Sequence, residues 1–371
     1  MQERGKSTLV KFIISALEQQ YNIDPEKDVV YTSFTGKATQ VLQKKGNKNV
    51  STLHKLLFES IPNPDGTFFR RPVTSIDYKI VVVDECSMVP KELLEALFKH
   101  NCYILCLGDP GQLPPINKDD DNMLLQNPDI FLDEIMRQDE DSEIIDLTMK
   151  IRNGEPLQRY EGKEIQILNK NELTTGMLLW ADQIICATNS MRTSLNNQMR
   201  ELTGHEGEPQ DGDKIICLKN NWEIFSDDYN PLVNGTIGYL KNPFSTNLHL
   251  PPFITSTHKA ETIPVTMGEF VSDTEENYGN LVMDKKLIVE GEAGLDWRTS
   301  YNMSRHYKFR SAIPQQFTYG YAITCHKSQG SEWDKVLVIE EGFPFDKEEH
   351  RRWLYTAATR AAKKLVIIKK E

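Results

Sequence analysis

The chain has 371 residues, with 43 Lys and Arg against 54 Asp and Glu, which gives a formal net charge of −11. Hydrophobic residues make up 39% and charged residues 26%, a mixture that excludes a disordered or fibrous chain. No run approaches the ~20 consecutive apolar residues of a membrane-spanning helix. The acidic balance argues against nucleic-acid binding by bulk charge but leaves room for a local basic channel. We expect a cytoplasmic protein of two or three domains.

The first half of the chain alternates helical and strand patterns, as in an α/β layered domain. A helix is predicted over residues 9–20, directly after Gly5-Lys6-Ser7-Thr8. Unbroken apolar runs predict strands buried on both faces of a parallel sheet, and these runs cover residues 29–31, 80–83 and 103–107. Helical patterns fill the gaps near 36–45, 51–58, 90–99 and 142–153.

A second α/β segment begins near residue 160, with a strand predicted over 183–187 and a helix over 190–202. Residues 211–312 alternate short strand-like runs, at 214–218, 236–240 and 287–290, with proline-rich turns, which predicts a small β-rich insertion. The α/β pattern returns at Phe317, with a strand at 335–339, a helix at 347–359 and a last strand at 364–368.

Six cysteines, at positions 86, 102, 106, 186, 217 and 325, form no CxxC pair and have no histidine at zinc spacing. This spacing predicts free, buried thiols in a reducing compartment, rather than a disulfide framework or a metal site. The acidic run at 117–122 is predicted to be a solvated loop.

The first candidate for chemistry is Gly5-Lys6-Ser7-Thr8, because phosphate binding at a helix N-terminus uses close backbone N–H groups, a cation and a hydroxyl for Mg²⁺. The complete motif has an earlier glycine, five positions before Gly5, so an ordinary helix start remains the alternative.

Asp84 and Glu85 follow the strand predicted at 80–83. At the carboxyl end of a parallel strand, both carboxylates face the crevice where ligands bind. Asp84 is suited to hold Mg²⁺, and Glu85 to orient and deprotonate a water for attack on a γ-phosphate. A solvated Asp-Glu pair at a strand end is the alternative.

Residues 107–116 (LGDPGQLPPI) follow another buried strand, so they lie at the same rim of the sheet. Their Gln112 is a neutral amide able to report a γ-phosphate to the rest of the protein. A Gly/Pro turn with an exposed glutamine is the alternative.

Together these strings resemble superfamily 1 DNA helicases, specifically the RecD/Dda-like branch (SF1B). The N-terminal strings are Gly5-Lys6-Ser7, residues 84–88 (DECSM) and residues 108–115 (GDPGQLPP). Further along, Arg137-Gln138 resembles the family's fourth motif, residues 321–333 (YAITCHKSQGSEW) its fifth and residues 354–361 (LYTAATRA) its sixth. The resemblance keeps the family's order from residue 5 to about 368.

The resemblance implies hydrolysis of Mg-ATP, with Lys6, Asp84, Glu85, Gln112, Arg137 and Arg360 as catalytic residues. The implied nucleotide contacts are Gly5, Lys6, Ser7, Thr8, Gly330 and Glu332, and the implied Mg²⁺ ligands are Ser7 and Asp84. Arg360 is the candidate finger, a planar cation that reaches the γ-phosphate when two lobes close, and Arg137 would be a second such cation. For either arginine, a surface salt bridge is the alternative.

The implied partners are single-stranded DNA and junctions of single- and double-stranded DNA, which need phosphate donors and flat faces for bases. The implied contacts are Thr35, Lys37, Thr52, His54, Thr324, His326, Lys327, Ser328 and Gln329. For His54 a satisfied core histidine, and for Lys37 a solvated lysine, are the alternatives.

Residues 58–72 (FESIPNPDGTFFRRP) carry Pro-Asp-Gly between apolar runs, which predicts a β-hairpin. In relatives the segment at this position is a pin that splits strands. Phe68 and Phe69 would stack on the base pair at the fork. An ordinary surface hairpin with both rings packed inward is the alternative.

Relatives have a nucleotide-contacting glutamine motif, a helix, a strand and the first loop glycine upstream of Gly5, and residues 1–4 stand in the variable loop. We therefore expect this chain to lack an inner strand of its first sheet and part of the phosphate cradle. One hypothesis is a fragment, a miscalled start or half of a split protein whose missing segment is supplied in trans. The other is a degenerate, ATP-inactive relative.

The resulting expectation is two RecA-like P-loop NTPase lobes with parallel sheets. Lobe 1 covers residues 1–160, with a pin-like hairpin at 58–76, and lobe 2 covers 161–215 and 313–371, with a β-rich, SH3-like insertion at 216–312. We expect an ATP-dependent helicase moving 5′→3′ on single-stranded DNA in the cytoplasm of a bacterial or phage-infected cell. The alternatives are an ATP-inactive DNA-binding subunit and a translocase that strips proteins without unwinding.

Overall fold

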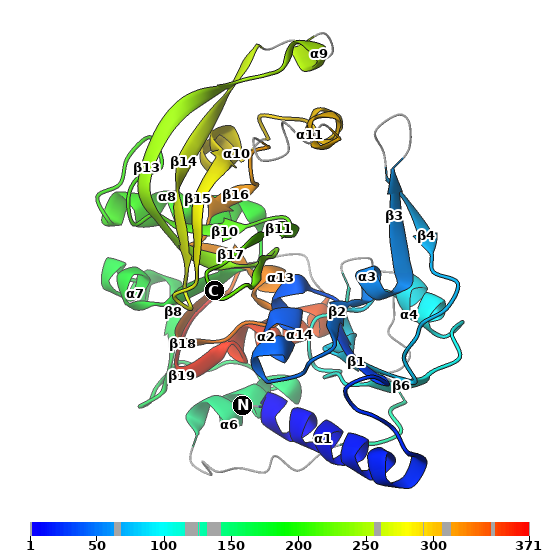
Figure 1. Ribbon diagram of the computed structural model, residues 1–371. Helices are drawn as coiled ribbons and strands as arrows, with labels where there is room; N and C mark the ends of the chain where they lie inside the picture. Colours follow the sequence, from blue (N-terminus) through cyan, green and yellow to red (C-terminus); the bar gives the residue numbers. More distant parts are fainter. Residues whose placement is uncertain are drawn as a thin grey trace. The chain divides into compact units, whose positions relative to one another are not determined.

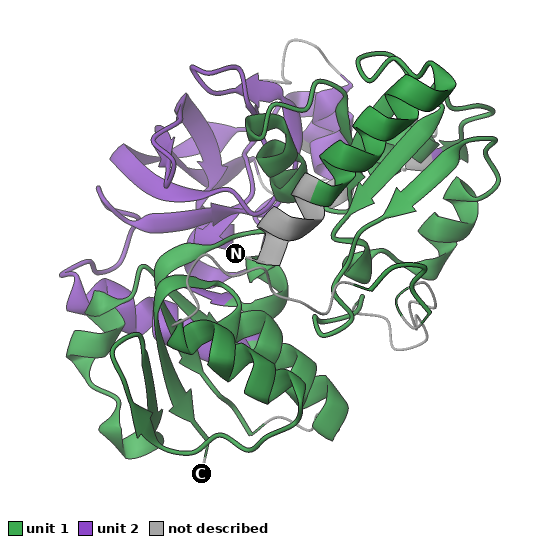
Figure 2. Cartoon of the chain, turned by 90° about the horizontal axis from the view of Figure 1, so that it is seen from below, with its two compact units in different colours: residues 1–59, 71–188, 324–371 green, residues 60–70, 189–323 purple. Residues whose placement is uncertain are grey.

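The computed structural model describes residues 2–62, 68–115, 125, 127–131, 142–255, 261–291, 293–305, 313–342 and 346–370. Two compact units make up the chain (Figure 2). Unit 1 comprises Met1–Glu59, Arg71–Thr188 and Thr324–Glu371, and unit 2 comprises Ser60–Arg70 and Asn189–Ile323. Unit 1 contains the whole first sheet and all of the second except Ala322 and Ile323, so this division differs from the predicted lobe boundaries, which stay a prediction.

The first sheet of unit 1 is parallel, with the strand order β2-β1-β5-β6. Figure 1 labels β1, β2 and β6 of this sheet. Its strands are β1 (Val29–Ser33), β2 (Val50–Thr52), β5 (Ile80–Asp84) and β6 (Tyr103–Cys106). The helices beside it are α1 (Gln2–Tyr21), α2 (Gly36–Lys44), α3 (Leu53–Leu57), η1 (Cys86–Met88) and α4 (Lys91–Leu97). The predicted parallel strands are thus present, with bounds that differ by a residue or two.

Successive residues of β5 pack on opposite faces of this sheet, as the period of two in a strand requires. Ile80 and Val82 pack with Val10 and Ile14 of α1 on one face. On the other face, β5 packs against α3 and α4 through Val81, Val83, Leu53, Leu57, Leu93, Leu94 and Leu97. Because both faces are covered, the strand needs apolar residues at every position, which is the pattern seen in its sequence.

One expectation for the start of the chain is wrong in the described structure. The residues before Gly5 were expected in a loop, but α1 begins at Gln2, and Gln, Glu and Arg are all residues with a high helix propensity. In the described sheet, β5 pairs directly with β1 and with β6. The structure describes no strand before α1, and the expectation that an inner strand is missing stays a prediction.

The second sheet of unit 1 has the strand order β17-β9-β18-β19-β8-β7. Its strands are β7 (Tyr160–Glu161), β8 (Ile165–Asn169), β9 (Gln183–Cys186), β17 (Ala322–Thr324), β18 (Trp333–Ile339) and β19 (Ala361–Lys369). The neighbours β9, β18, β19 and β8 pair in parallel, and β7 pairs antiparallel with β8. The accompanying helices are α6 (Glu143–Arg152), η2 (Lys170–Glu172), α7 (Thr175–Trp180), α13 (Cys325–Ser328) and α14 (Lys347–Ala358).

Unit 2 is built on an antiparallel sheet with the order β15-β14-β13-β10-β16. Its strands are β10 (Lys214–Cys217), β13 (Ile237–His249), β14 (Thr262–Ser272), β15 (Asn277–Asp284) and β16 (Phe317–Tyr319), beside a separate pair of β11 (Asn221–Phe225) and β12 (Pro231–Leu232). Its helices are α8 (Asn189–Leu202), α9 (Pro252–Thr255), α10 (Lys285–Glu290) and α11 (Trp297–Ser304). The insertion is β-rich as predicted, and its likeness to an SH3 domain stays a prediction.

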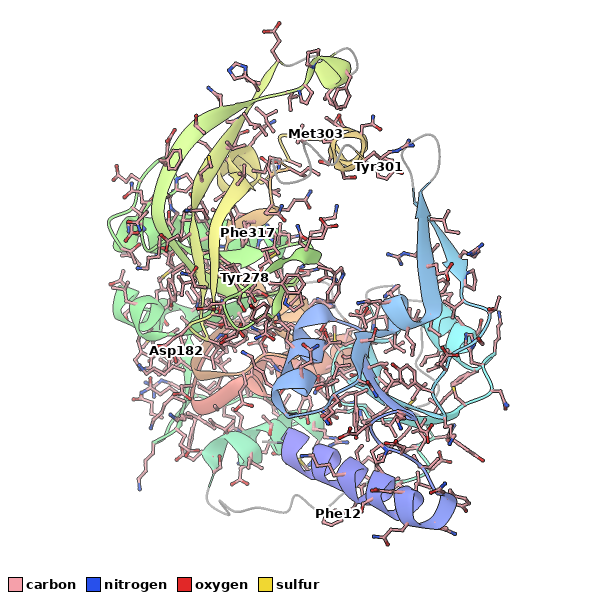
Figure 3. All side chains as sticks on the ribbon, in the orientation of Figure 1. Phe12, Asp182, Tyr278, Tyr301, Met303 and Phe317 are labelled. Carbon is pink, nitrogen blue, oxygen red and sulfur yellow. The ribbon has the colours of Figure 1, made fainter. Side chains whose placement is uncertain are left out.

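Aromatic rings hold the centre of this sheet. The ring centroid of Phe270 lies 4.9 Å from that of Phe317 and 5.7 Å from that of Tyr278, and all three side chains are buried. Tyr278 and Phe317 are labelled in Figure 3. Gly238 lies on the neighbouring strand, where a Cβ would stand 2.2 Å from the carbonyl oxygen of Val271. The close approach of β13 and β14 therefore requires glycine at this position.

The strand predicted at residues 287–290 is wrong, because these residues belong to helix α10. The Asp284 carboxylate caps the helix by accepting from the backbone N–H of Leu287 at 3.1 Å. Gly291 ends it in the left-handed conformation, with φ of 79°. These two caps outweigh the strand preference of the β-branched pair Ile288-Val289.

The predicted hairpin is present as the two-stranded sheet of β3 (Phe58–Pro62) and β4 (Phe68–Pro72). An ion pair of 2.6 Å joins Arg71 Nη2 to Glu59 Oε2 across the two strands.

The acidic loop predicted at 117–122 lies outside the described residues. All six cysteines are free, four of them buried and Cys102 and Cys106 partly exposed. Among the described residues, no helix is both long and apolar enough to cross a membrane.

Candidate functional site

The two adjacent carboxylates lie where β5 ends. Asp84 is its last residue, and Glu85 follows in the left-handed conformation with φ of 52°, an unusual backbone state for a residue with a side chain. The N–H of Glu85 donates to Asp84 Oδ1 at 3.0 Å. Glu85 is only 5% exposed, which excludes the alternative of a solvated pair. Backbone strain of this kind is concentrated at functional sites.

Gln112 lies in a tight turn built on Asp109. The Asp109 Oδ1 atom accepts from the N–H of Gly111 at 2.9 Å, and its carbonyl accepts from the N–H of Gln112 at 3.1 Å. Asp109 and Gln112 are each 5% exposed, so the alternative of an exposed glutamine is wrong. A Cβ on Gly108 would stand 2.7 Å from Cys86 Sγ, which explains the glycine that opens this turn.

Arg360 follows helix α14 and is buried, with 5% of its surface exposed. Its Nε donates to the carbonyl of Thr356 at 3.1 Å, and its Nη1 to the carbonyl of Ser331 at 3.2 Å. Its Nη2 donates to Thr359 Oγ1 at 3.1 Å. These acceptors are neutral oxygens, so the alternative of a surface salt bridge is wrong. A buried guanidinium held by neutral acceptors keeps its charge available to an anion.

Hydrogen bonds join the Gln112 turn to the segments around α13 and α14. The hydroxyl of Tyr355 donates to Asp109 Oδ2 at 2.8 Å, and the N–H of Leu113 donates to Thr356 Oγ1 at 2.9 Å. The Nε2 of Gln329 donates to the carbonyl of Leu113 at 3.3 Å. Within unit 1, three sequence strings predicted to act together are therefore in direct contact.

Gly330, which follows α13, has the left-handed backbone conformation with φ of 76°. A Cβ atom on this residue would lie 3.4 Å from the Cβ of Ala38 in α2. Glycine therefore allows this segment to come close to the helix that begins after Thr35. Glu332, the predicted ribose contact, is exposed.

The predicted DNA contacts of the first sheet stand at helix starts and beside aromatic rings. Thr35 Oγ1 accepts from the N–H of Ala38 at 3.2 Å, and Thr52 Oγ1 from that of Lys55 at 3.3 Å, so both threonines are N-caps. The ring of His54 lies 5.6 Å from that of Phe34, and its side chain is half-buried. Lys37 is also half-buried.

The predicted contacts around α13 divide into two groups. His326 and Lys327 are half-buried, whereas Ser328 and Gln329 are buried and used in internal hydrogen bonds. Thr324 precedes the helix as its N-cap residue. Burial lowers the pKa of His326 and raises that of the neighbouring Cys325 thiol to about 12, so both are neutral near pH 7.

Several predicted residues lie partly or wholly outside the described part of the chain. Gly5, Lys6, Ser7 and Thr8 lie in α1, and Phe68 and Phe69 in β4, but their side chains lie outside the described part of the chain. Arg137 lies wholly outside it. No group of three or more His, Cys, Asp or Glu that could hold a metal occurs among the described residues.

Sequence reasoning missed Asp109, Tyr355 and Thr356. All three are buried and lie inside the same motifs as Gln112 and Arg360. The only signal for them in the sequence was their position three to five residues from a predicted catalytic side chain.

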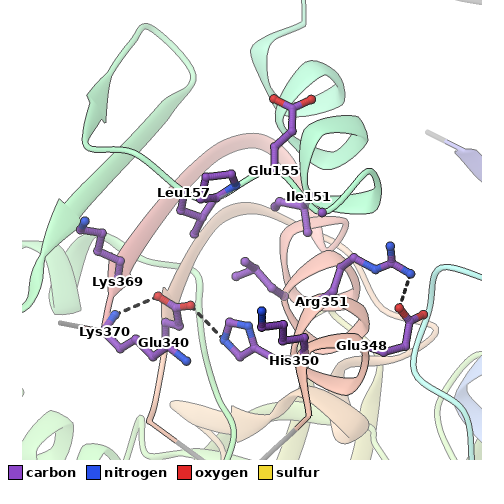
Figure 4. A pocket seen from close by; sticks show the side chains of 13 residues that line it. Ile151, Glu155, Leu157, Glu340, Glu348, His350, Arg351, Lys369 and Lys370 are labelled. Atoms are coloured by element: carbon purple, nitrogen blue, oxygen red, sulfur yellow. Dashed lines mark hydrogen bonds and ion pairs between the residues drawn. The ribbon is translucent and has the colours of Figure 1, made fainter.

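A separate cavity of about 600 Å³ lies at the start of α14 and contains none of the predicted site residues (Figure 4). Glu340 accepts there from the N–H of Lys370 at 2.8 Å and pairs with His350 Nε2 at 2.9 Å. Its lining carries cations and carboxylates that pair with one another, such as Arg351 with Glu348.

Two family models match the chain. Residues 4–174 match the AAA domain, and residues 319–368 match the UvrD-like helicase C-terminal domain. The chain is 25% identical to the ATP-dependent RecD2 DNA helicase of Deinococcus radiodurans over 96% of its own length, which is 44% of that protein. It is 24% identical to an uncharacterized protein of Acanthamoeba polyphaga mimivirus, with 95% of this chain and 92% of that one covered.

Among solved structures, the chain resembles the Pif1 helicase of Candida albicans with a TM-score of 0.52 and 16% identity, covering 98% of this chain and 88% of that one. It resembles the Bacteroides Pif1 helicase in complex with ADP-AlF3 and ssDNA with a TM-score of 0.50 and 15% identity, covering 96% and 91%. This likeness confirms the predicted α/β fold of two RecA-like lobes.

Proposed function

We propose that the chain is a superfamily 1 DNA helicase of the RecD/Dda-like branch, which hydrolyses ATP to move along single-stranded DNA and separate duplexes. Because the chain spans less than half of the RecD2 helicase it matches, the activity of the whole relative is part of the proposal.

The buried Arg360 is the observation that carries this proposal. Its guanidinium donates to neutral oxygens and lies two hydrogen bonds away from the turn that carries Gln112. A planar cation and an amide held in this way are suited to bind the γ-phosphate as negative charge develops during transfer. Buried Glu85 is the candidate base for the attacking water.

The oxygen donor set fits Mg²⁺, which prefers carboxylate and hydroxyl oxygens. Asp84, at the carboxyl end of a parallel strand, would hold the ion together with Ser7. Bound Mg²⁺ neutralises phosphate charge. Lys6 and the neighbouring residues of α1 would bind the phosphates of ATP, and Gly330 and Glu332 would bind its sugar side.

The half-buried donors Lys37, His54, His326 and Lys327 support single-strand binding, because partly exposed cations and rings can contact phosphates and bases. Thr35, Thr52 and Thr324, at helix starts, would add hydroxyl and backbone donors. Movement in the 5′→3′ direction is implied by the family resemblance alone.

The test is ATP hydrolysis with and without a single-stranded oligonucleotide, together with unwinding of forked duplexes tailed at the 5′ or the 3′ end. We expect stimulation by DNA and unwinding of the 5′-tailed substrate. Glu85→Gln should lower turnover about 10²–10⁴-fold because it removes the base while keeping the shape. Unwinding that survives in Glu85→Gln would contradict the proposal.

A second candidate is a translocase that displaces proteins from single strands without unwinding. This function is favoured if the hairpin β3–β4 does not separate the two strands at the fork. Replacing Phe68 and Phe69 by Ala should spare translocation and abolish unwinding if the pin acts on the fork. Equal unwinding by the double variant would favour a hairpin that only packs.

A further inference from the structure

We infer that Asp109, Tyr355 and Thr356 form a latch that positions Gln112 and Arg360 relative to each other. The inference rests on the proposed hydrolysis of ATP and adds three positioning residues to it. None of the three is proposed to touch the nucleotide.

The first half of the latch is the Asp109 carboxylate, whose two oxygens have different partners. Oδ1 accepts from the N–H of Gly111 and so shapes the turn that presents Gln112. Oδ2 accepts from the Tyr355 hydroxyl of α14 at 2.8 Å. One carboxylate thus sets the conformation of the turn and ties it to the helix that precedes Arg360.

The second half is Thr356, which bonds to both sides at once. Its Oγ1 accepts from the N–H of Leu113, next to Gln112, at 2.9 Å. Its carbonyl accepts from the Nε of Arg360 at 3.1 Å. A path of two hydrogen bonds through one residue therefore connects the segment of the amide to the guanidinium.

The three residues of the latch are buried, and burial gives them the rigidity that positioning needs. Tyr355 and Thr356 have 0% of their surface exposed, and Asp109 has 5%. A Cβ on Gly111 would stand 3.1 Å from Tyr355 Cε1, so glycine lets the turn lie against this ring. Hydrogen bonds shielded from water are stronger and more directional than exposed ones.

The expected consequence concerns the rate of the chemical step more than the binding of ATP. A displacement of about 1 Å at a catalytic group can cost on the order of 10²-fold in rate. Gln112 and Arg360 would act on charge that develops only in the transition state. Loosening the latch should therefore lower kcat and leave the KM for ATP nearly unchanged.

The test uses the full chain and two conservative changes. Thr356→Val removes the acceptor for Leu113 while keeping the shape, and Thr356→Ser keeps the acceptor. We expect Thr356→Val and Tyr355→Phe to lower DNA-stimulated kcat about tenfold or more, with KM within about twofold. Thr356→Ser should stay near wild type. Hydrogen exchange at the Leu113 amide should become faster in Thr356→Val and remain slow in Thr356→Ser.

Tyr319→Phe is the matched control, because it removes the hydroxyl of another buried tyrosine, in unit 2, and should leave kcat unchanged. If the Leu113 amide loses protection in Thr356→Val while kcat stays at the wild-type value, the latch is only structural and the inference is overturned. A parallel rise in KM would also overturn it. A wild-type chain without DNA-stimulated turnover would instead overturn the proposed function.

Discussion

Two buried arginines, one in each unit, have opposite surroundings. Arg200 of unit 2 donates from Nε to Asp213 Oδ1 at 3.1 Å, and its guanidinium lies 4.4 Å from the centre of the Tyr319 ring. Arg360 of unit 1 donates to two backbone carbonyls and a threonine hydroxyl. The first charge is neutralised by a fully buried carboxylate, whereas the second is held by neutral atoms.

The network around Arg200 is closed within unit 2. Asp213 also accepts from the Tyr321 hydroxyl at 3.0 Å and from the N–H of Gln210 at 2.8 Å, and His205 Nδ1 lies 2.9 Å from it. Burial, followed by the charge of Asp213, raises the pKa of Tyr321 to about 12, so this hydroxyl remains a donor at neutral pH. Such a network stabilises the fold and leaves no charge for a ligand. The described hydrogen bonds of Arg360 go to neutral oxygens instead, which supports its proposed role in binding an anion.

The largest expected effect is on Arg360. Arg360→Ala should lower DNA-stimulated ATP hydrolysis about 10³–10⁵-fold, because a finger cation acts on the transferring phosphoryl group. Thermal unfolding should change little by comparison. Arg360→Lys is the control, and it should restore only a small part of the rate, since a lysine lacks the planar fork. A stability loss with an unchanged rate would place Arg360 in the same class as Arg200.

Arg200 should behave in the reverse way. Arg200→Ala leaves the Asp213 carboxylate buried without its cation, which we expect to lower the free energy of unfolding by about 3–5 kcal/mol. Denaturant unfolding measures this loss. The ATP turnover of the protein that remains folded should match the wild type, and a specific loss of turnover would contradict the contrast between the two arginines.

A smaller change should come from the β13–β14 contact of unit 2. Gly238→Ala places a Cβ 2.2 Å from the backbone oxygen of Val271, where neither strand can easily move. We expect a loss of about 1–3 kcal/mol in the free energy of unfolding, typical of overpacking. Gly268→Ala is a graded control, because its nearest backbone oxygen is 2.9 Å away, and it should cost less.

Features that depend on local sequence patterns could be predicted, whereas features that depend on contacts between distant parts of the chain could not. The strand at β5 was predictable because both faces are apolar, so Ile80 to Val83 form an unbroken run. The helix at Lys285–Glu290 was not predictable, because the N-cap at Asp284 and the C-cap at Gly291 stabilise it more than the local residues favour a strand. The roles of Gln112 and Arg360 were expected from their sequence motifs. The structure adds the hydrogen bonds that connect the two segments. The Tyr355–Asp109 bond spans 246 positions, and no periodicity in the sequence reports on it.

The smallest expected effect is a dependence of stability on pH through His326. Burial lowers the pKa of this imidazole below its ordinary value of 6.5, so the unfolded chain binds the proton more readily than the folded chain. Its neutral form therefore favours folding above pH 6.5, and stability falls as the pH drops through this value. His326→Asn should make the stability fall less steeply below pH 6.5, because the unfolded chain then binds at most one proton fewer relative to the folded chain. An identical pH profile would show that other groups cause it.

The central claim is that side chains from separate sequence motifs of unit 1 act on one triphosphate. The most direct test is a structure of the full chain with a non-hydrolysable ATP analogue and a single-stranded oligonucleotide. The account predicts donor–acceptor distances of about 2.7–3.1 Å from both Arg360 and Gln112 to oxygens of the γ-phosphate. A bound analogue whose terminal phosphate contacts neither side chain, directly or through one water, would contradict it.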